Sequence, residues 1–213
     1  LTEHNNMATV ISSATSILIG HVLEKTESIR VGSGGIMLPN HAPLVVAEQF
    51  GTLEAMYPKR VDLGLGRAPG TDMRTAHALR RTTQETAFAF PQDVEELQNY
   101  FKSIDQQGAV RAFPGVDAHV PIYILGSSTS SASLAARLGL PYVFAAHFAP
   151  TQLEEALHIY RNQFTPSEYL AEPHVMVCVN VVAADSNEEA EKLSTTTNRF
   201  YLNVVRRSED FLQ

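Results

Sequence analysis

Hydroxyl groups gather at one point of the sequence in a pattern that suits an anion. Gly126 is followed by Ser-Ser-Thr-Ser-Ser at 127–131, between the apolar run 120–125 and a helical pattern. Backbone N–H groups at the start of a helix, together with hydroxyl groups, form a common phosphate site. Ordinary capping by serine is the simpler alternative, but five hydroxyl residues in a row exceed what a cap needs.

An arginine and a group of glycines follow two other apolar runs. Arg67 comes directly after the run that ends in Gly64-Leu65-Gly66, and an arginine there can bind a phosphate through two parallel hydrogen bonds. A surface ion pair explains Arg67 equally well. Glycines at 32, 34 and 35 end the earlier run, where they let a flat ligand approach the main chain. A bulge or close helix packing would also explain them.

Two histidines stand where acid–base chemistry is possible. His4 follows Glu3 at what reads as the end of a strand, and a histidine beside a carboxylate exchanges protons near neutral pH. A solvated polar loop is the alternative there, and His147, after the run 142–146, has the same two interpretations. His41 reads as a residue that only precedes a helix. No spacing of His, Asp or Glu indicates a metal site, and Cys178, inside an apolar run, is expected to be an inert core residue.

Alternating strands and helices would carry these residues. Periodicity predicts helices at 9–24, 43–57, 71–81, from 90 onward, from the serine run to Gly139, at 153–164 and at 186–205. Strands are predicted at 29–36, 60–66, 120–125, 141–146 and 174–184, and the segment 102–118 reads as an excursion with room for a small hairpin. Such alternation predicts one domain with a parallel sheet covered by helices. The carboxyl ends of parallel strands share one side, so the candidate residues would share it too.

Composition excludes several classes of function. The chain has 213 residues and a net charge of −7, which argues against nucleic acid or an anionic membrane as partner. One cysteine fits a reducing compartment, hence the cytoplasm, and no apolar segment is long enough to span a bilayer. An open doubly wound sheet and a barrel both fit the order of elements. The absence of GxGxxG after the first strand, and informative loops after several strands, favour the barrel. Residues 1–4 read as the tail of a strand, so we expect them to belong to a longer chain.

Taken together, these segments resemble the bacterial luciferase-like flavin-dependent monooxygenases, in particular the small single-chain luciferase-family oxidoreductases. The resemblance is carried by residues 3–7 (EHNNM), 29–72, 90–94 (FPQDV) and 121–150. It implies an α/β fold, a (β/α)8 TIM barrel that binds FMN at its C-terminal rim, lacking strand 1 and strand 8 in the residues given.

The same resemblance implies roles for single residues. His4 would be catalytic, with Glu3 beside it, and the Gly34–Gly35 bond would be a cis peptide against the flavin ring. Arg67 and the serine turn, through Ser127, Ser128 and Ser131, would hold the flavin phosphate from opposite sides of the barrel. Asn5 stands where many relatives have a second histidine, and Gly66 where bacterial luciferase has a reactive cysteine, which argues against light emission.

The implied activity is an oxidation by reduced FMN and O₂ of a small apolar organic substrate, with a separate flavin reductase and a homodimeric enzyme. Three alternatives stay open. The barrel could instead use the deazaflavin F420 for hydride transfer, bind flavin without turnover, or hold the phosphate of a phosphorylated metabolite at the serine turn.

Overall fold

A parallel sheet forms the centre of the molecule. The computed structural model describes residues 1–8, 10–68, 70–79, 88–147 and 149–206. Within them the strands are β1 (Val31–Met37), β2 (Val61–Gly66), β3 (Ile122–Gly126), β4 (Tyr142–Phe144) and β5 (Val175–Val177). They lie side by side in the order of the sequence, and each pair of neighbours is parallel. All carboxyl ends therefore meet at one edge, and we call the loops that follow them the rim.

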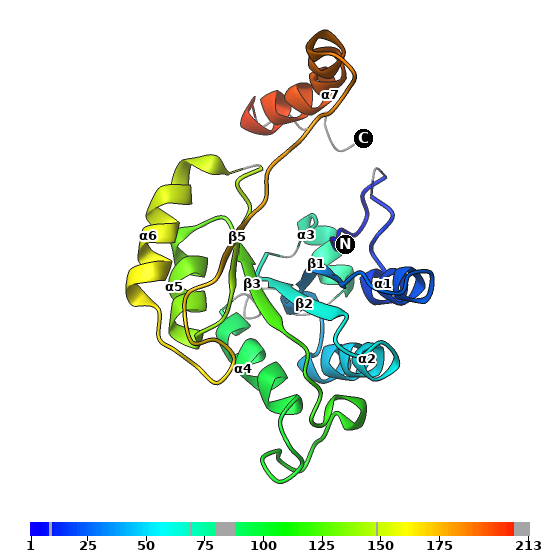
Figure 1. Cartoon of the computed structure of the whole chain (residues 1–213), viewed down its shortest axis with the longest axis vertical. Helices are drawn as coiled ribbons and strands as arrows, with labels where there is room; N and C mark the ends of the chain where they lie inside the picture. Colours follow the sequence, from blue (N-terminus) through cyan, green and yellow to red (C-terminus); the bar gives the residue numbers. More distant parts are fainter. Residues whose placement is uncertain (9, 69, 80–87, 148, 207–213) are drawn as a thin grey trace.

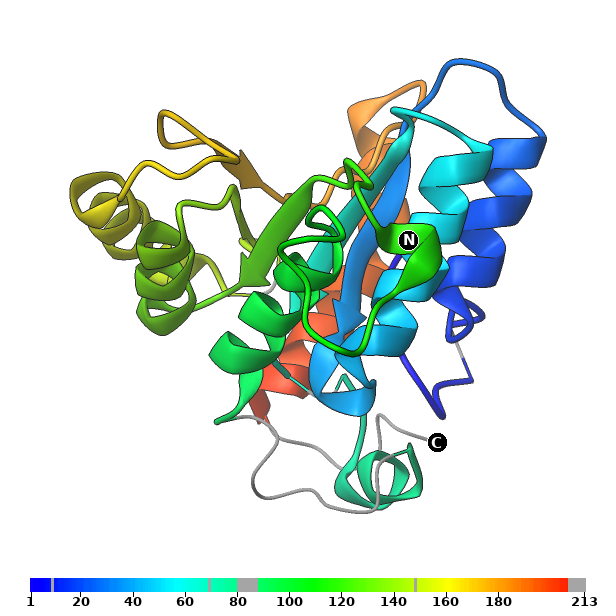
Figure 2. The same ribbon diagram turned by 90° about the horizontal axis from the view of Figure 1, so that it is seen from below.

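Helices cover one face of this sheet. Figure 1 shows α1, α2, α4, α5 and α6 in an arc around the strands, while α7 lies on the opposite side, and Figure 2 shows the same arrangement from below. The bounds of the helices are α1 (Thr15–Glu24), α2 (Pro43–Met56), α3 (Met73–Leu79), α4 (Phe90–Tyr100), α5 (Thr129–Leu138), α6 (Leu153–Gln163) and α7 (Asn187–Arg206).

The core lies between the sheet and the arc of helices. In β3, Ile122 and Ile124 are buried, whereas Tyr123 and Leu125 are only half-buried. This alternation sends every second side chain toward the helices and the others toward the inner face of the sheet. Opposite the buried strand residues, α2 presents Phe50, which is fully buried.

The first residues extend the sheet beyond β1. The Leu1 amino group donates to the Gly32 carbonyl at 2.8 Å, and the Gly34 amide donates to the Leu1 carbonyl at 2.6 Å. The Glu3 amide donates to the Gly35 carbonyl at 3.3 Å. These bonds follow the ladder of a parallel strand, as expected for residues 1–4, and they bring Glu3 and His4 to the rim.

The helix predicted at 9–24 begins only at Thr15. Hydroxyl groups compete with the helix in the residues before it, because Ser12 Oγ donates to the Thr2 carbonyl at 2.5 Å and Thr15 Oγ1 donates to the Ser12 carbonyl at 2.8 Å. Such local bonds favour turns over helix. Ile11, which lies in this segment, is 90% exposed.

The long strand predicted at 174–184 is also wrong in its extent. Pairing with β4 ends near Cys178, whose amide donates to the Phe144 carbonyl at 2.9 Å. Beyond it, Val179 and Val181 are exposed, and Cys178 itself is a free, exposed cysteine rather than a core residue. An apolar run predicts a strand, but it forms one only beside a partner strand.

The remaining predicted elements agree with the structure, with two local differences. The helix predicted at 71–81 is α3, held at its start by the Asp72 carboxylate, which accepts from the Arg74 and Thr75 amides; positions 80 and 81 lie outside the described residues. The segment 102–118 contains a 3-10 turn, Phe113–Gly115, and no hairpin. Gly139, the predicted end of α5, follows this helix in the left-handed conformation that is common after a helix, with φ of 62°.

These features confirm the α/β fold class. The parallel sheet, with its strands in sequence order and helices on the outer face, is the arrangement of a (β/α)8 barrel, of which the chain contains a part. Within the described parts of the chain, no helix combines the length and hydropathy that crossing a bilayer requires.

Candidate functional site at the carboxyl ends of the strands

Residues 3–6 are fastened to the loop after β2, and we call this set of contacts the rim clasp. His4 Nδ1 lies 3.0 Å from the Gly70 carbonyl, and Thr71 Oγ1 donates to the Asn5 carbonyl at 2.8 Å. Asn6 Nδ2 donates to Thr75 Oγ1 at 3.1 Å and to an Asp72 oxygen at 3.4 Å. The rim clasp therefore spans the carboxyl end of β1, which lies between the two segments.

The contact with Gly70 assigns the tautomer of His4. A carbonyl oxygen only accepts hydrogen bonds, so Nδ1 of His4 must carry a proton. In the neutral ring Nε2 is then the unprotonated nitrogen, free to accept a proton. The side chain is half-buried, so His4 reaches the rim with its basic nitrogen in a defined position.

Glu3 is buried and fully engaged, unlike a residue of a solvated loop. Its side chain is 1% exposed, and both carboxylate oxygens lie 2.9 Å from His41 Nε2. The Met37 amide donates to Oε2 at 2.9 Å, and Asn5 Nδ2 donates to Oε1 at 3.2 Å. Burial by itself raises the pKa of Glu3, but the hydrogen bond and charge of His41, with the Met37 and Asn5 donors, bring that pKa below its ordinary value.

His41 is the site residue that sequence reasoning missed. It appeared only to precede α2, yet it pairs with a carboxylate 38 positions earlier in the chain. Local spacing cannot reveal such a pair. The one available signal was its place in the turn after β1, which parallel pairing brings to the rim.

Arg67 and the serine turn are neighbours rather than opposite walls. Gly66 pairs with Leu125, so Arg67 and Gly126 are the next residues along two adjacent strands. This corrects the expectation that the phosphate would be held from opposite sides of the barrel. Arg67 is exposed, and the described residues provide no ion pair for it.

The three predicted serines differ in whether their hydroxyl groups are available to a ligand. Ser131 Oγ donates to the Ser128 carbonyl at 2.7 Å and lies 3.0 Å from the Tyr142 hydroxyl, so it is already part of the turn. Burial raises the pKa of Tyr142, which stays a neutral donor to the Ser128 carbonyl at 3.1 Å. Ser127 and Ser128 are half-exposed, and Ser128 precedes α5 without using its hydroxyl as a cap. Ser127 and Ser128 therefore remain as hydroxyl ligands.

The Gly34–Gly35 peptide bond is cis, as the resemblance implied. Gly34 is exposed, and among the described residues a Cβ built on it would come no closer than 3.9 Å to another atom, the Leu1 carbonyl oxygen. A Cβ on Gly35, by contrast, would lie 2.6 Å from the Gly64 carbonyl oxygen. The main chain at Gly34 thus leaves open space that a flat ring can occupy, while Gly35 allows the close approach of β2.

These residues fit a planar cofactor that carries a phosphate. Gly34 offers open main chain for a ring, and Arg67, Ser127 and Ser128 offer a charge and two hydroxyls for an anion. His147 also lies at the rim, where burial lowers its pKa and its carbonyl accepts from Asn180 Nδ2 at 2.9 Å. In the part of the chain that the structure describes, no group of three or more His, Cys, Asp or Glu side chains could hold a metal ion.

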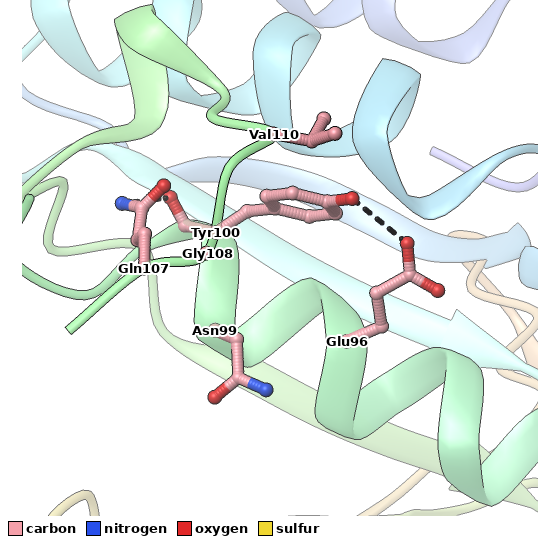
Figure 3. Close-up of a pocket in the computed structure, with 6 residues that line it drawn as sticks. All are labelled: Glu96, Asn99, Tyr100, Gln107, Gly108 and Val110. Carbon is pink, nitrogen blue, oxygen red and sulfur yellow. Dashed lines mark hydrogen bonds between the residues drawn. The ribbon is translucent and has the colours of Figure 1, made fainter.

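A pocket of about 230 Å³ lies away from the rim. Figure 3 shows Tyr100 across it, with its hydroxyl donating to Glu96 Oε1 at 2.9 Å. The pocket is at the C-terminal end of α4, and α4 runs antiparallel to the strands (Figure 2), so it opens at the other end of the sheet. It contains none of the predicted site residues.

The chain belongs to the luciferase-like monooxygenase family, whose family model matches residues 1–212. The protein YvbT of Bacillus subtilis (strain 168) is 56% identical over 214 residues, covering 100% of this chain and 63% of that protein. A luciferase-like monooxygenase of Escherichia coli (strain K12) is 53% identical over 206 residues, covering 97% and 62%. The crystal structure of apo-MsnO8 superposes with a TM-score of 0.91 and 34% identity, covering 100% and 63%. The chain thus spans about three fifths of these proteins' length.

More distant similarities include proteins whose names state an activity. An N-acetyl-S-alkylcysteine monooxygenase of Bacillus subtilis (strain 168) is 36% identical over 196 residues, covering 89% of this chain and 58% of that protein. The oxygenase component of a flavin-dependent trigonelline monooxygenase from Acinetobacter baylyi is 21% identical. Two solved structures share the fold: the oxygenating constituent of 3,6-diketocamphane monooxygenase with FMN, at a TM-score of 0.69 and 18% identity, and an F420-dependent secondary alcohol dehydrogenase, at 0.55 and 18%.

Proposed function

We propose that this chain is the flavin-binding part of an FMN-dependent monooxygenase that uses reduced FMN and O₂ on a small organic substrate. The observation that carries the proposal is the rim itself. Among the described residues, Arg67 has no ion pair and the Ser127 and Ser128 hydroxyls have no hydrogen bond, and these side chains lie at the ends of adjacent strands. The open main chain at Gly34 and the His4 ring, whose Nδ1 meets the Gly70 carbonyl, also support the proposal. Reduced FMN, when bound there, would supply the electrons that activate O₂.

Arg67, Ser127 and Ser128 would hold the phosphate of the cofactor. The guanidinium can present two parallel N–H groups to a phosphate. The two serines stand at the start of α5, where the first backbone N–H groups of the helix lack partners within the helix. Ser131 would support the turn through its bonds to Ser128 and Tyr142 instead of binding the phosphate.

His4 would exchange a proton through Nε2. Its Nδ1–H is fixed on the Gly70 carbonyl, so only Nε2 is available to accept a proton from a substrate or return one. The carboxylate of Glu3 is saturated by three donors, Asn5, the Met37 amide and His41, and His4 is not among them. Its role is therefore to hold the segment that carries His4, rather than to exchange protons itself.

The inner face of the sheet favours a small apolar substrate. Leu125 and Val143 pair across β3 and β4 and are half-buried, so they give the inner face an apolar surface next to the rim. Methyl groups of Leu125 lie against the positions of Gly35 and Gly64. A small aldehyde, alkane or aromatic compound would gain from burying its apolar surface there.

A separate reductase would supply the reduced flavin. One relative is named as an oxygenase component, and one solved structure as an oxygenating constituent, of a larger system. This chain likewise lacks a GxGxxG motif for a nicotinamide cofactor after its strands.

The decisive experiment mixes the full-length protein with photoreduced FMN under anaerobic conditions and then adds O₂. Binding is read from the flavin fluorescence of an oxidised FMN titration, and reaction from the flavin spectrum in a stopped-flow instrument. The proposal expects tight binding of FMN and a reoxidation course that differs from that of free reduced FMN. Binding without any change in reoxidation would instead support a flavin-binding protein that has no turnover.

A second candidate is hydride transfer with F420 on the same barrel. The observation in its favour is the shared fold with the F420-dependent secondary alcohol dehydrogenase. The same rim residues would serve, because F420 also has a planar ring system and a phosphate. Parallel titrations with F420 separate the two candidates: tighter binding of F420 than of FMN, with no response to O₂, would favour hydride transfer.

A further inference from the structure

The buried carboxylate of Glu3 joins three separate segments of the rim. Its partners are Met37, the last residue of β1; His41, in the turn before α2; and Asn5, in its own segment. A carboxylate with 1% exposure needs donors for its oxygens, because an unpaired buried charge is strongly unfavourable. Of the three donors, His41 is the one that contacts both oxygens, each at 2.9 Å.

The segment that Glu3 anchors is the one that presents His4. On its other side the rim clasp fixes the same segment to Gly70, Thr71 and Asp72. Residues 3–6 are therefore held from two directions, by His41 and Met37 on one side and by the loop after β2 on the other. The position of the His4 ring depends on both anchors, because a short segment cannot hold its direction when one of them is released.

We propose that His41 is a positioning residue for His4 and acts through the hydrogen bond that its Nε2 donates to Glu3. The inference rests on the proposed function of His4 as the residue that exchanges a proton. With His41 in place, Glu3 holds residues 3–6 so that Nδ1 of His4 meets the Gly70 carbonyl and Nε2 faces the reaction. When this bond is lost, Glu3 turns toward its remaining donors and the His4–Gly70 bond weakens.

The proposal makes the hydrogen bond, and not the charge of His41, the acting feature. A neutral imidazole with a proton on Nε2 already donates to Glu3. Glutamine places an amide nitrogen close to the Nε2 position of histidine and can donate in the same way without titrating. Asparagine is one carbon shorter, so its amide does not reach Glu3. The pair His41→Gln and His41→Asn therefore differs in reach while both variants are polar and uncharged.

The test reads the tautomer of His4 directly. Long-range ¹H–¹⁵N spectra of ¹⁵N-histidine-labelled full-length protein, with the His4 signals identified by their loss in His4→Gln, show which ring nitrogen carries the proton. Wild type and His41→Gln are expected to show His4 with the proton on Nδ1. His41→Asn is expected to shift more than half of the His4 population to the Nε2–H form. The control is His158→Asn, because His158 is exposed on α6 and, among the described residues, its ring bonds to Asn162 of the same helix.

Turnover gives a second readout in the same variants. His41→Asn should lower kcat/KM by about 10- to 100-fold, the scale of a small displacement at a reacting group, whereas His41→Gln should stay within about threefold of wild type. A loss of kcat/KM in both His41→Asn and His41→Gln would overturn the proposal, because the charge of His41 and not its hydrogen bond would then be what matters. An unchanged His4 tautomer and full activity in His41→Asn would overturn it as well.

Failure of the proposal can be told apart from failure of the proposed function. The tautomer is measured without flavin, so it stays informative if FMN does not bind. A protein that binds no FMN but shows the expected tautomer shift would reject the function and keep the positioning role. If circular dichroism shows that a variant does not fold, the ¹H–¹⁵N spectrum of the wild-type protein tests the proposal instead. It should contain a slowly exchanging, strongly downfield proton on Nε2 of His41, and its absence would refute the bond to Glu3.

Discussion

Single residues at the rim differ in whether their side chains already form hydrogen bonds or ion pairs within the fold. Ser131 is committed to the Ser128 carbonyl and the Tyr142 hydroxyl, and Glu3 is saturated by its donors. Arg67 is exposed and has no ion pair within the described residues. A ligand is bound most tightly by groups that lose only contacts with water when they bind it. Removal of Arg67 should therefore weaken the binding of an anion more than removal of the other rim residues.

Arg67→Ala should weaken the binding of FMN by about 1.5–3 kcal/mol, the scale of a hydrogen bond to a charged group. Because the arginine is assigned to the phosphate, the affinity for riboflavin, which lacks the phosphate, should stay the same. Fluorescence titration of both flavins measures the difference. Arg137→Ala is the matched control, since Arg137 is an exposed arginine in the last turn of α5, away from the rim. An equal loss for riboflavin would remove Arg67 from the phosphate site.

Glu3 should make the stability of the protein depend on acid. Its pKa is lower in the folded state than its ordinary value of about 4.3. The stability that its ionised form contributes is therefore fully present above that value and is lost as the pH falls through the lower, folded pKa. Glu3→Gln should unfold more easily than wild type at pH 7, by about 1.5–3 kcal/mol.

The difference between Glu3→Gln and wild type should shrink as the pH is lowered below about 4.3. Urea unfolding of both proteins from pH 7 to pH 3 gives this comparison, and the other carboxylates cancel because both proteins contain them. A difference that is constant over the whole range would mean that Glu3 is not held in its ionised form.

At the scale of elements, α2 packs against the 3-10 turn Phe113–Gly115 at Gly51. A Cβ on Gly51 would lie 2.5 Å from both the N and Cα atoms of Gly115, which are backbone atoms and cannot turn aside. Helix propensity alone would favour alanine at Gly51 by about 1 kcal/mol. The close contact outweighs this gain, so Gly51→Ala should destabilise the protein by about 1–3 kcal/mol.

Gly108→Ala is the control for this substitution, because a Cβ there meets nothing within 4 Å. It should leave stability unchanged or raise it by about 0.4–1 kcal/mol, through the reduced freedom of the unfolded chain. Thermal unfolding of the two variants side by side measures both effects. A stabilised Gly51→Ala variant would show that α2 is not in contact with this turn in solution.

The sequence predicted most elements because their signals are local. Pro43 at the start of α2, Gly139 after α5 and the spacing of Val94 and Leu97 in α4 each act within a few residues. The signals failed where a partner far away in the chain decides. Within the described residues, no strand pairs with the run 174–184 after Cys178, and the residues before Thr15 are held by the Thr2 carbonyl.

The same limit applies to the candidate site. Arg67 and the serines became candidates because they directly follow predicted strands, and the glycines because they end one. The pairing of Glu3 with His41 was not predicted. The distance between these two residues is set by how the chain turns at the end of β1, and no periodic pattern in the sequence reveals it. Likewise, only the register of β2 and β3 shows that Arg67 and the serine turn are adjacent.

At the scale of the whole molecule, we propose that a homodimer, which the family resemblance implies, would form through α1 and α2. Ile17 is 72% exposed and Val45 is 44% exposed, each in the first turn of its helix. The two helices lie next to each other in the arc of Figure 1. Exposed apolar side chains on neighbouring helices are typical of surfaces that bind another protein.

Ile17→Asp should therefore shift the full-length protein from dimer to monomer, because a carboxylate is costly to bury at an apolar contact. Sedimentation velocity at several protein concentrations measures the shift. Ile104→Asp serves as control, since Ile104 is 45% exposed in the segment 102–118 and not on either helix. A dimer that survives Ile17→Asp would exclude this part of α1 from the interface.

The order of the strands also has a consequence for how the chain folds. Neighbouring strands are joined by connections of very different length. The chain from Ile124 to its paired residue Tyr142 is short, whereas the chain from Leu63 to its paired residue Ile122 is long. Closing the second, roughly threefold longer loop costs about 1 kcal/mol more in chain entropy. The β3–α5–β4 unit should then form first, with β2 joining later.

Pulsed hydrogen exchange during refolding would show this order as protection of amides at 122–144 before those at 61–66. Simultaneous protection would contradict it. If the order holds, the serine turn and the Tyr142 hydroxyl that supports it are in place before Arg67 arrives beside them. The two halves of the proposed phosphate site would then belong to different stages of folding, and an anion could bind both only after the later stage.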